Sequence, residues 1–272
     1  MNIRVTSTLS KHIQLPYRLV KGTVEDRNNY ARSLTNTLLC AVKQKVYSRD
    51  ISLATLRKIL NDSKPKKVPL YIEVNDDSTA RATLNTIMSD NNEKIIGFKL
   101  GVNVNESGNV SRIDLPTIAH ELQHFADFLY HPKILAREQK LRSKNLYNHK
   151  YEQFYDKWIY VGEEFKGKKD KRKVIKCIKH KFEKFLRRLS TEDKINYLQY
   201  IRYCLTMEDK AYRTQRKVGK NLYKKNFEVY EFDIENLNTA YMFQEKINLL
   251  KNMIFSLIKK EREIHKVKLN KE

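Results

Sequence analysis

The sequence predicts an α+β protein that is mostly helical, and three observations lead to this fold class. All five prolines and four of the seven glycines lie within the first 132 residues, so the second half lacks the residues that usually break helices. Residues 68–74 and 95–104 alternate apolar and polar positions as strands do. Other stretches repeat apolar residues every three or four positions, which is the period of an amphipathic helix. We therefore expect a small sheet in the first half and a helical, basic second half.

The sequence of the first half predicts three helices and an edge strand. Thr23 is suited to cap a helix over residues 24–48, and a shorter helix fits residues 52–60. A proline near the start of strand 68–74 indicates an edge position, because proline cannot donate a ladder hydrogen bond. Residues 78–88 are predicted to form a further helix.

A second strand leads into the helix that carries the chemistry. In the strand 95–104 the apolar residues share one face, while Gly97 and Gly101 lie on the other and indicate a β-bulge or a close backbone approach. Residues 105–109 predict a turn, and residues 114–130 predict a helix.

The second half predicts long helices. Ser190 and Asp193 form a capping pair for a helix that passes through Ala211, and residues 234–265 form a final helix. We expect four regions. They are a helical N-terminal region (1–62), a sheet with its following helix (63–131), a basic helical insert (132–190) and long C-terminal helices (191–272).

The charge of the protein is concentrated in the insert. The chain has 54 Lys and Arg against 32 Asp and Glu, a net charge of +22, and residues 131–190 alone hold 19 against 7. Basic residues with aromatic neighbours can pair phosphates and stack on bases, whereas the alternative is a solvated helix face. We predict electrostatic, sequence-tolerant nucleic-acid binding through residues 131–190. The candidate contacts are Lys168, Lys169, Lys171, Arg172, Lys173 and Lys176.

Targeting signals are absent from the sequence as given. Its first 20 residues have basic residues spread through them and no apolar core of a signal peptide. The longest unbroken apolar run, residues 38–42, is far below the ~18 residues that span a bilayer. We expect a protein that is cytoplasmic or virion-associated, is not secreted by a signal peptide and has no membrane partner. The many Lys, Asn, Ile and Tyr residues suggest an AT-rich genome, such as that of a phage or another virus.

His120, Glu121 and His124 form the motif H-E-x-x-H within the predicted helix 114–130. Four residues advance a helix by about 400°, so both histidines project from one face and can bind one Zn²⁺. Glu121 lies about 100° further round and can take a proton from a water at the metal. The alternative is a pair of ordinary histidines on an amphipathic helix. The spacing favours a zinc site with Glu121 as general base.

A catalytic zinc site usually has three protein ligands and an open position. The third histidine of the metzincin pattern is absent, because Tyr130 stands at its position. Glu208 is the preferred third ligand, since Ala211 near the same helix face lets a second helix approach. Asp127 is better placed to orient a ligand imidazole by a hydrogen bond than to bind the metal. Two further carboxylates are weaker alternatives: Glu163 and Glu164.

The strand, the turn, the H-E-x-x-H helix and the later E-x-x-A segment resemble the gluzincin type of zincin metallopeptidases, which includes small phage and bacterial members. The resemblance covers the strand-to-helix stretch and a short segment around Glu208. It implies a zincin-like core in which His120, His124 and Glu208 bind zinc and Glu121 is the general base. It also implies that the strand 95–104 holds a peptide by edge pairing.

These residues predict a zinc-dependent metallopeptidase that hydrolyses a peptide or protein substrate by a zinc-activated water. Tyr212, one turn after Glu208, is the candidate donor to the developing oxyanion, with a purely packing role as the alternative. A second function remains open, a basic nucleic-acid-associated or virion-type structural protein that retains an inactive zincin scaffold. A third is a helical interaction protein with a chance motif.

Overall fold

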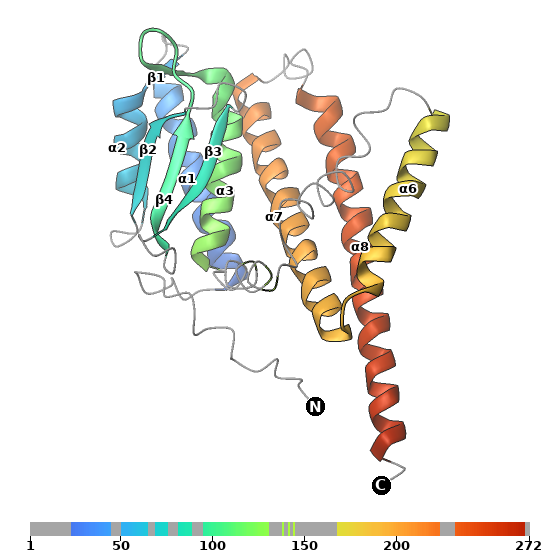
Figure 1. The fold of residues 1–272 in the computed structure, drawn as a ribbon. Coiled ribbons are helices and arrows are strands. Elements are labelled where there is room, and N and C mark those ends of the chain that lie inside the picture. The colour runs from blue at the N-terminus through green and yellow to red at the C-terminus, as the bar shows by residue number, and fades with distance from the viewer. Residues whose placement is uncertain are drawn as a thin grey trace. The chain divides into compact units, whose positions relative to one another are not determined.

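The protein is described here from a computed structural model (Figure 1). The structure describes residues 23–44, 50–64, 69–75, 81–88, 95–130, 138, 141, 144, 168–223 and 232–269. They divide into two compact units, one from residues 1–136 and 210–233 and the other from residues 137–209 and 234–272. Helices predominate and the sheets are small, so the α+β, mostly helical class is confirmed. The predicted division into four regions stays a prediction.

Two capped helices begin the first unit. Helix α1 (Val24–Gln44) starts after Thr23, whose hydroxyl accepts a hydrogen bond from the Asp26 amide at 3.1 Å while the Asp26 carboxylate accepts one from the Thr23 amide. This reciprocal arrangement satisfies two backbone donors at the helix start, as predicted. Helix α2 (Leu53–Ser63) is capped by Ser52 and extends three residues beyond the predicted end at residue 60. Residues 45–49, where the first predicted helix was to end, lie outside the described residues.

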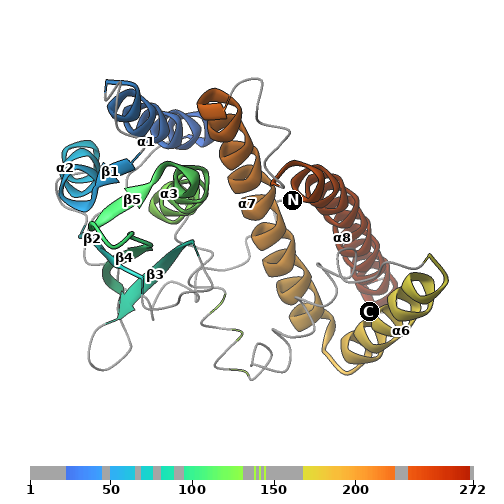
Figure 2. The same ribbon diagram turned by 90° about the horizontal axis from the view of Figure 1, so that it is seen from above.

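The main sheet has three strands in the order β2-β4-β3. Strand β2 (Leu70–Val74) runs parallel to β4 (Ile95–Val102) and stands at an edge, as its proline predicted. On the face of β4 predicted to be apolar, Phe98, Leu100 and Val102 are fully buried, whereas Ile96 near the start of the strand is 43% exposed. Helix α3 (Leu115–Tyr130) packs against the sheet, and α1 lies beside α3 (Figure 2).

The predicted helix over residues 78–88 is wrong. Residues 82–88 form strand β3 (Ala82–Met88), which pairs with β4 antiparallel along its whole length. The segment contains the β-branched residues Thr83, Thr86 and Ile87, which favour a strand wherever a partner is available. Pairing with β4 therefore decides the conformation, and this long-range contact is invisible to a local pattern.

Both glycines of β4 lie where the chain approaches closely. A Cβ at Gly101 would stand 2.6 Å from the Thr83 hydroxyl oxygen, and one at Gly97 would stand 3.0 Å from the Pro69 Cβ. Ile87 pairs with Gly97 while Met88 pairs with Ile95, so the ladder shifts beside Gly97. The predicted close approach is confirmed, and the ladder is irregular beside Gly97, where the alternative was a bulge.

The resemblance implied that strand 95–104 binds a substrate through a free edge, and this expectation is wrong. Strand β4 is the central strand and pairs with β2 on one side and with β3 on the other. Its backbone hydrogen-bonding groups are therefore engaged on both sides over the paired residues. The strands at the ends of this sheet are β2 and β3.

A short ladder leads the chain into α3. Strands β1 (Asp50–Ser52) and β5 (Asn109–Ser111) pair antiparallel, and neither was predicted. The predicted turn at 105–109 is present and contains Gly108 at a φ of 69°, which a residue with a side chain rarely adopts. A 3₁₀ turn η2 (Arg112–Asp114) follows β5, and α3 begins directly after it, one residue later than predicted.

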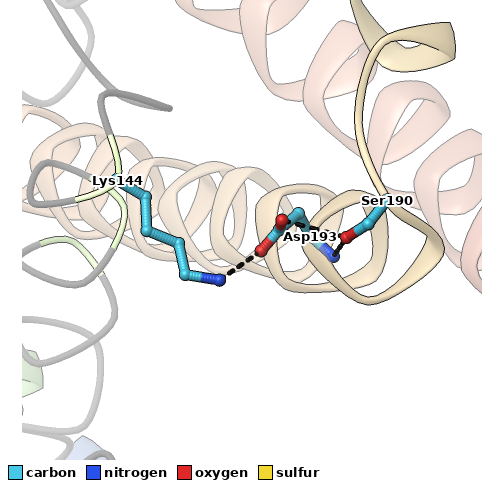
Figure 3. Close-up of polar contacts among 3 residues, drawn as sticks. All are labelled: Lys144, Ser190 and Asp193. Carbon is cyan, nitrogen blue, oxygen red and sulfur yellow. Dashed lines mark hydrogen bonds and ion pairs between the residues drawn. The ribbon is translucent and has the colours of Figure 1, made fainter.

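The described part of the second unit is mainly helical. It contains helix α6 (Lys168–Arg187), the first part of helix α7 (Thr191–Tyr223), whose residues from 210 onward belong to the first unit, and nearly all of helix α8 (Phe232–Leu269). The Ser190 hydroxyl accepts a hydrogen bond from the Asp193 amide at 3.1 Å and donates one to the Asp193 carboxylate at 2.9 Å, which confirms the predicted capping pair (Figure 3). Lys144 adds an ion pair to the same carboxylate at 2.6 Å.

Apolar side chains of α6, α7 and α8 in this unit are buried, among them Phe182, Leu198, Ile201 and Phe243. In the predicted final helix, Ile247, Leu250 and Ile254 are buried along one stripe, and Leu257 and Ile258 further along it are partly buried. In the part of the chain that the structure describes, no helix has an apolar stretch long enough to cross a membrane.

Candidate metal centre

Helix α3 carries both histidines of the H-E-x-x-H motif. Its apolar residues are fully buried in the core of the first unit and hold the helix in place: Leu115, Ile118, Leu122, Phe125 and Leu129. His120 and His124 are each only 8% exposed. Their ring centroids lie 4.8 Å apart, and their Nε2 atoms lie 3.1 Å apart. The two imidazoles therefore converge on one point through the same ring atom.

The distance between the two Nε2 atoms fits a shared metal. Two imidazole nitrogens bound to one tetrahedral zinc at about 2.0–2.1 Å stand roughly 3.3 Å apart. The observed 3.1 Å is close to this separation, and it is also the length of an ordinary hydrogen bond between two rings. A ring can bind a metal through Nε2 only if the hydrogen is on its other nitrogen, Nδ1. The hydrogen bond made by Nδ1 therefore shows which ring presents a lone pair.

Gln215 of α7 fixes the tautomer of His120. Its Oε1 atom lies 3.0 Å from the Nδ1 atom of His120, and both side chains are buried. Because an amide oxygen can only accept, Nδ1 of His120 donates this hydrogen bond, and Nε2 is the ring nitrogen that can present a lone pair to a metal. This is the arrangement in which metal-binding histidines are usually held by a second hydrogen bond.

Glu208 completes a group of three ligands. One ligand atom from each of His120, His124 and Glu208 lies within 4.8 Å of the other two. Helix α7 runs without interruption from Thr191 to Tyr223, so the position of Glu208 on it follows from helical geometry. Two imidazoles and one carboxylate at this spacing could hold a metal ion, with a position left open for a further ligand.

Three residues of α7 lie along one face of the helix. Tyr212 and Gln215 follow Glu208 by four and seven residues, which places them about 40° and 20° from it around the helix axis. The Tyr212 ring packs edge-on against the His120 ring, with centroids 4.7 Å apart and planes at 81°. Ala211 between them is fully buried, in agreement with the predicted close approach. Tyr212 therefore lies beside the metal-binding group.

Glu121 occupies the next position of α3. It is partly buried, whereas the two histidines of the motif are buried. Its helical position places it about 100° round from His120. A carboxylate there can reach a molecule that approaches the open metal position.

Asp127 is the most deeply buried carboxylate of α3, with no exposed surface. Arg27 of α1 forms an ion pair with it at 3.1 Å, and Gln123 donates a hydrogen bond to it at 3.4 Å. Burial raises the pKa of Asp127, and the positive charges of Arg27 and Lys210 oppose this rise. The role predicted for Asp127, a hydrogen bond to a ligand imidazole, is filled at His120 by Gln215.

Comparisons with known proteins identify no relative of this chain. No family model, no curated protein and no solved structure matches the chain. The case for a metal centre therefore depends on the geometry of its own residues.

The side chains of most predicted nucleic-acid contacts lie outside the described part of the structure. Residues 168–176 belong to helix α6, but only Lys176 among the candidate side chains is described, and it is exposed. Most of residues 131–167, including Glu163 and Glu164, lie outside the described residues. The nucleic-acid interface therefore stays a prediction.

Replacing Gln215 by Leu is expected to weaken metal binding by about 10- to 100-fold, because His120 loses the hydrogen bond that fixes its tautomer and orientation. Gln215→Glu keeps an accepting oxygen at the same place and is expected to retain most of the affinity. Metal affinity measured by competition with a chromophoric chelator checks both variants. Equal affinity of Gln215→Leu and the parent protein would show that this hydrogen bond does not support the site.

Proposed function

We propose that the protein is a zinc-dependent metallopeptidase with a core of the gluzincin type. The observation that supports this proposal is the convergence of His120, His124 and Glu208, whose ligand atoms lie within 4.8 Å of one another. Two histidines and one glutamate are the ligand set of several catalytic zinc sites of peptidases, where the fourth position is open. The same three residues were selected from the sequence because of the helical spacing of the motif.

The chain's own residues supply the remaining functions. Zinc in such a site polarises the scissile carbonyl and lowers the pKa of a bound water. Glu121 takes the proton from the attacking water and later gives it to the leaving amine, as a general base and then a general acid. Tyr212 donates a hydrogen bond to the oxygen on which negative charge develops. Gln215 accepts a hydrogen bond from Nδ1 of His120 and so keeps Nε2 of that ring directed toward the metal position.

Strand β3 replaces β4 as the candidate for holding an extended substrate. It stands at the end of the sheet, and it packs against the motif helix α3. A peptide added antiparallel to a sheet edge is bound mainly by backbone hydrogen bonds, so it is recognised with little dependence on its sequence. We therefore infer that specificity comes from side-chain contacts beyond this strand.

We expect the purified protein to contain close to one zinc ion per chain and to cleave peptides. His120→Ala, His124→Ala and Glu208→Ala are each expected to lower the zinc content to a small fraction of this value, because a three-ligand site loses one ligand. Elemental analysis after dialysis measures the zinc, and an internally quenched peptide library measures hydrolysis with and without a chelator.

Glu245→Ala is the matched control, since Glu245 is an exposed glutamate of another helix. Normal zinc content in the three ligand variants contradicts the metal centre. Zinc binding without any hydrolysis, together with binding to DNA, contradicts the peptidase and favours the alternative of a structural protein with an inactive scaffold.

A further inference from the structure

The first unit contains a cavity of about 320 Å³ that the metal centre does not use. It lies among α1, α3 and the C-terminal part of α7, which are neighbours in the view from above (Figure 2). Buried Thr35 and Gln123 form part of its floor. Sites for small molecules commonly have volumes from about 300 Å³ upward, so this cavity lies at the small end of that range.

The charge of the lining residues is entirely positive. Arg32 of α1 and three residues of α7 carry the charge, and none of the lining residues is an aspartate or a glutamate. Arg32, Arg213 and Lys217 are exposed. Lys210 is partly buried. Asparagine side chains from both helices add neutral hydrogen-bonding groups. Four cations around one recess produce a strongly positive potential, which favours an anion.

The polar floor of the cavity is already hydrogen-bonded. Thr35 donates to the carbonyl oxygen of Ala31 at 3.1 Å, and the Gln123 oxygen accepts from the Thr214 hydroxyl at 3.0 Å. The floor is therefore fixed in shape, and a ligand would find its partners among the cations and amides above it. Asp127 is held by Arg27 and Gln123 and is not one of the residues that line the cavity.

The cavity and the metal-binding group lie on different faces of α7. Lys210 and Lys217 follow Glu208 by two and nine residues, which places them about 200° and 180° round the helix from it. Tyr212 and Gln215 share the face of Glu208, as described above. A ligand in the cavity is therefore separate from the three metal ligands.

We propose that this cavity binds the phosphate group of a small molecule. Two arginine guanidinium groups offer planar pairs of donors that match phosphate oxygens, and two lysines add point charges. The size of the recess suits one phosphate and a small attached group. A nucleic-acid backbone is recognised by cations spread along a surface, whereas these four surround one recess with a buried floor.

The test measures the Kd of inorganic phosphate for the full-length protein by ³¹P NMR at constant ionic strength. The double variant Arg32→Gln/Lys217→Gln removes two exposed cations of the cavity, and we expect its Kd to rise at least about tenfold, because two charge-assisted hydrogen bonds are lost. Lys58→Gln/Lys220→Gln removes the same charge from exposed residues outside the lining, and we expect its Kd to stay within about twofold of the parent value.

Hydrogen exchange of the unaltered protein gives a second measurement that needs no variant. Phosphate is expected to slow exchange in residues 28–39 and 210–221, which line the cavity. An unchanged Kd in the cavity variant, or an equal loss in both variants, overturns the proposal. The proposal is also overturned if a random DNA duplex displaces phosphate and the cavity variant no longer binds that duplex. That result would favour a nucleic-acid surface. The metal centre is unaffected by any of these outcomes.

Discussion

Replacing Glu121 by Gln is expected to lower the rate of peptide hydrolysis by about 10²- to 10⁴-fold while the zinc content stays near one ion per chain. The amide has almost the shape of the carboxylate but cannot accept a proton from water, so only the acid–base contribution is removed. Zinc should remain, because Glu121 is not among the three residues whose ligand atoms converge. Parallel measurement of kcat/KM and of zinc content checks this prediction.

Glu106→Gln is the control for this experiment, since Glu106 is exposed in the turn before α3. It should leave both quantities unchanged. If Glu121→Gln cleaves peptides as fast as the parent protein, the peptidase proposal fails even if the metal centre is intact. If the variant loses zinc as well, Glu121 belongs to the metal-binding group and its assignment as a general base is wrong.

The metal-binding group could be predicted from the sequence because its geometry is largely local. Residues four apart on a helix share a face, so the motif alone places His120 and His124 together. Glu208 is far away in the chain, and it was selected because Ala211 near the same face permits close packing. The structure brings its carboxylate within reach of both histidines.

Gln215 could have been found by the same reasoning and was missed. It lies seven residues after Glu208, on the same helix face, and a buried glutamine beside a histidine is a natural partner for an imidazole. Glutamine has no distinctive pattern in a sequence, however, and Asp127, a carboxylate three residues after the second histidine, is the more obvious candidate. In the structure Asp127 forms an ion pair with Arg27 and accepts a hydrogen bond from Gln123.

The remaining errors have a common physical origin, since each depends on the pairing of one segment with another. Strand β3 takes its conformation from β4, and the three-residue strands β1 and β5 are too short to show an alternating pattern. The central place of β4 depends on partners on both sides. The cavity is similar, because its cations come from α1 and α7 and no single segment indicates them.

Replacing Arg27 by Met is expected to destabilise the protein by about 3–5 kcal/mol, because the fully buried carboxylate of Asp127 loses its ion pair at 3.1 Å. The loss should grow with pH. Burial already raises the pKa of Asp127, and Arg27 opposes this rise, so the variant favours the protonated acid still more. Below the unfolded pKa of about 3.9 the carboxyl is neutral in both folded and unfolded chains, and the electrostatic part of the loss disappears.

Urea unfolding of the parent and the variant at several pH values between about 5 and 8 measures this difference. Arg32→Met makes the same substitution at an exposed position of α1 and should change stability by less than about 0.5 kcal/mol. Adding Asp127→Asn to Arg27→Met removes the uncompensated charge but keeps an oxygen that can accept from Gln123, so the double variant should be more stable than Arg27→Met at neutral pH. A loss that is independent of pH and is not relieved by Asp127→Asn would mean that Arg27 stabilises the fold through packing of its side chain and not through its charge.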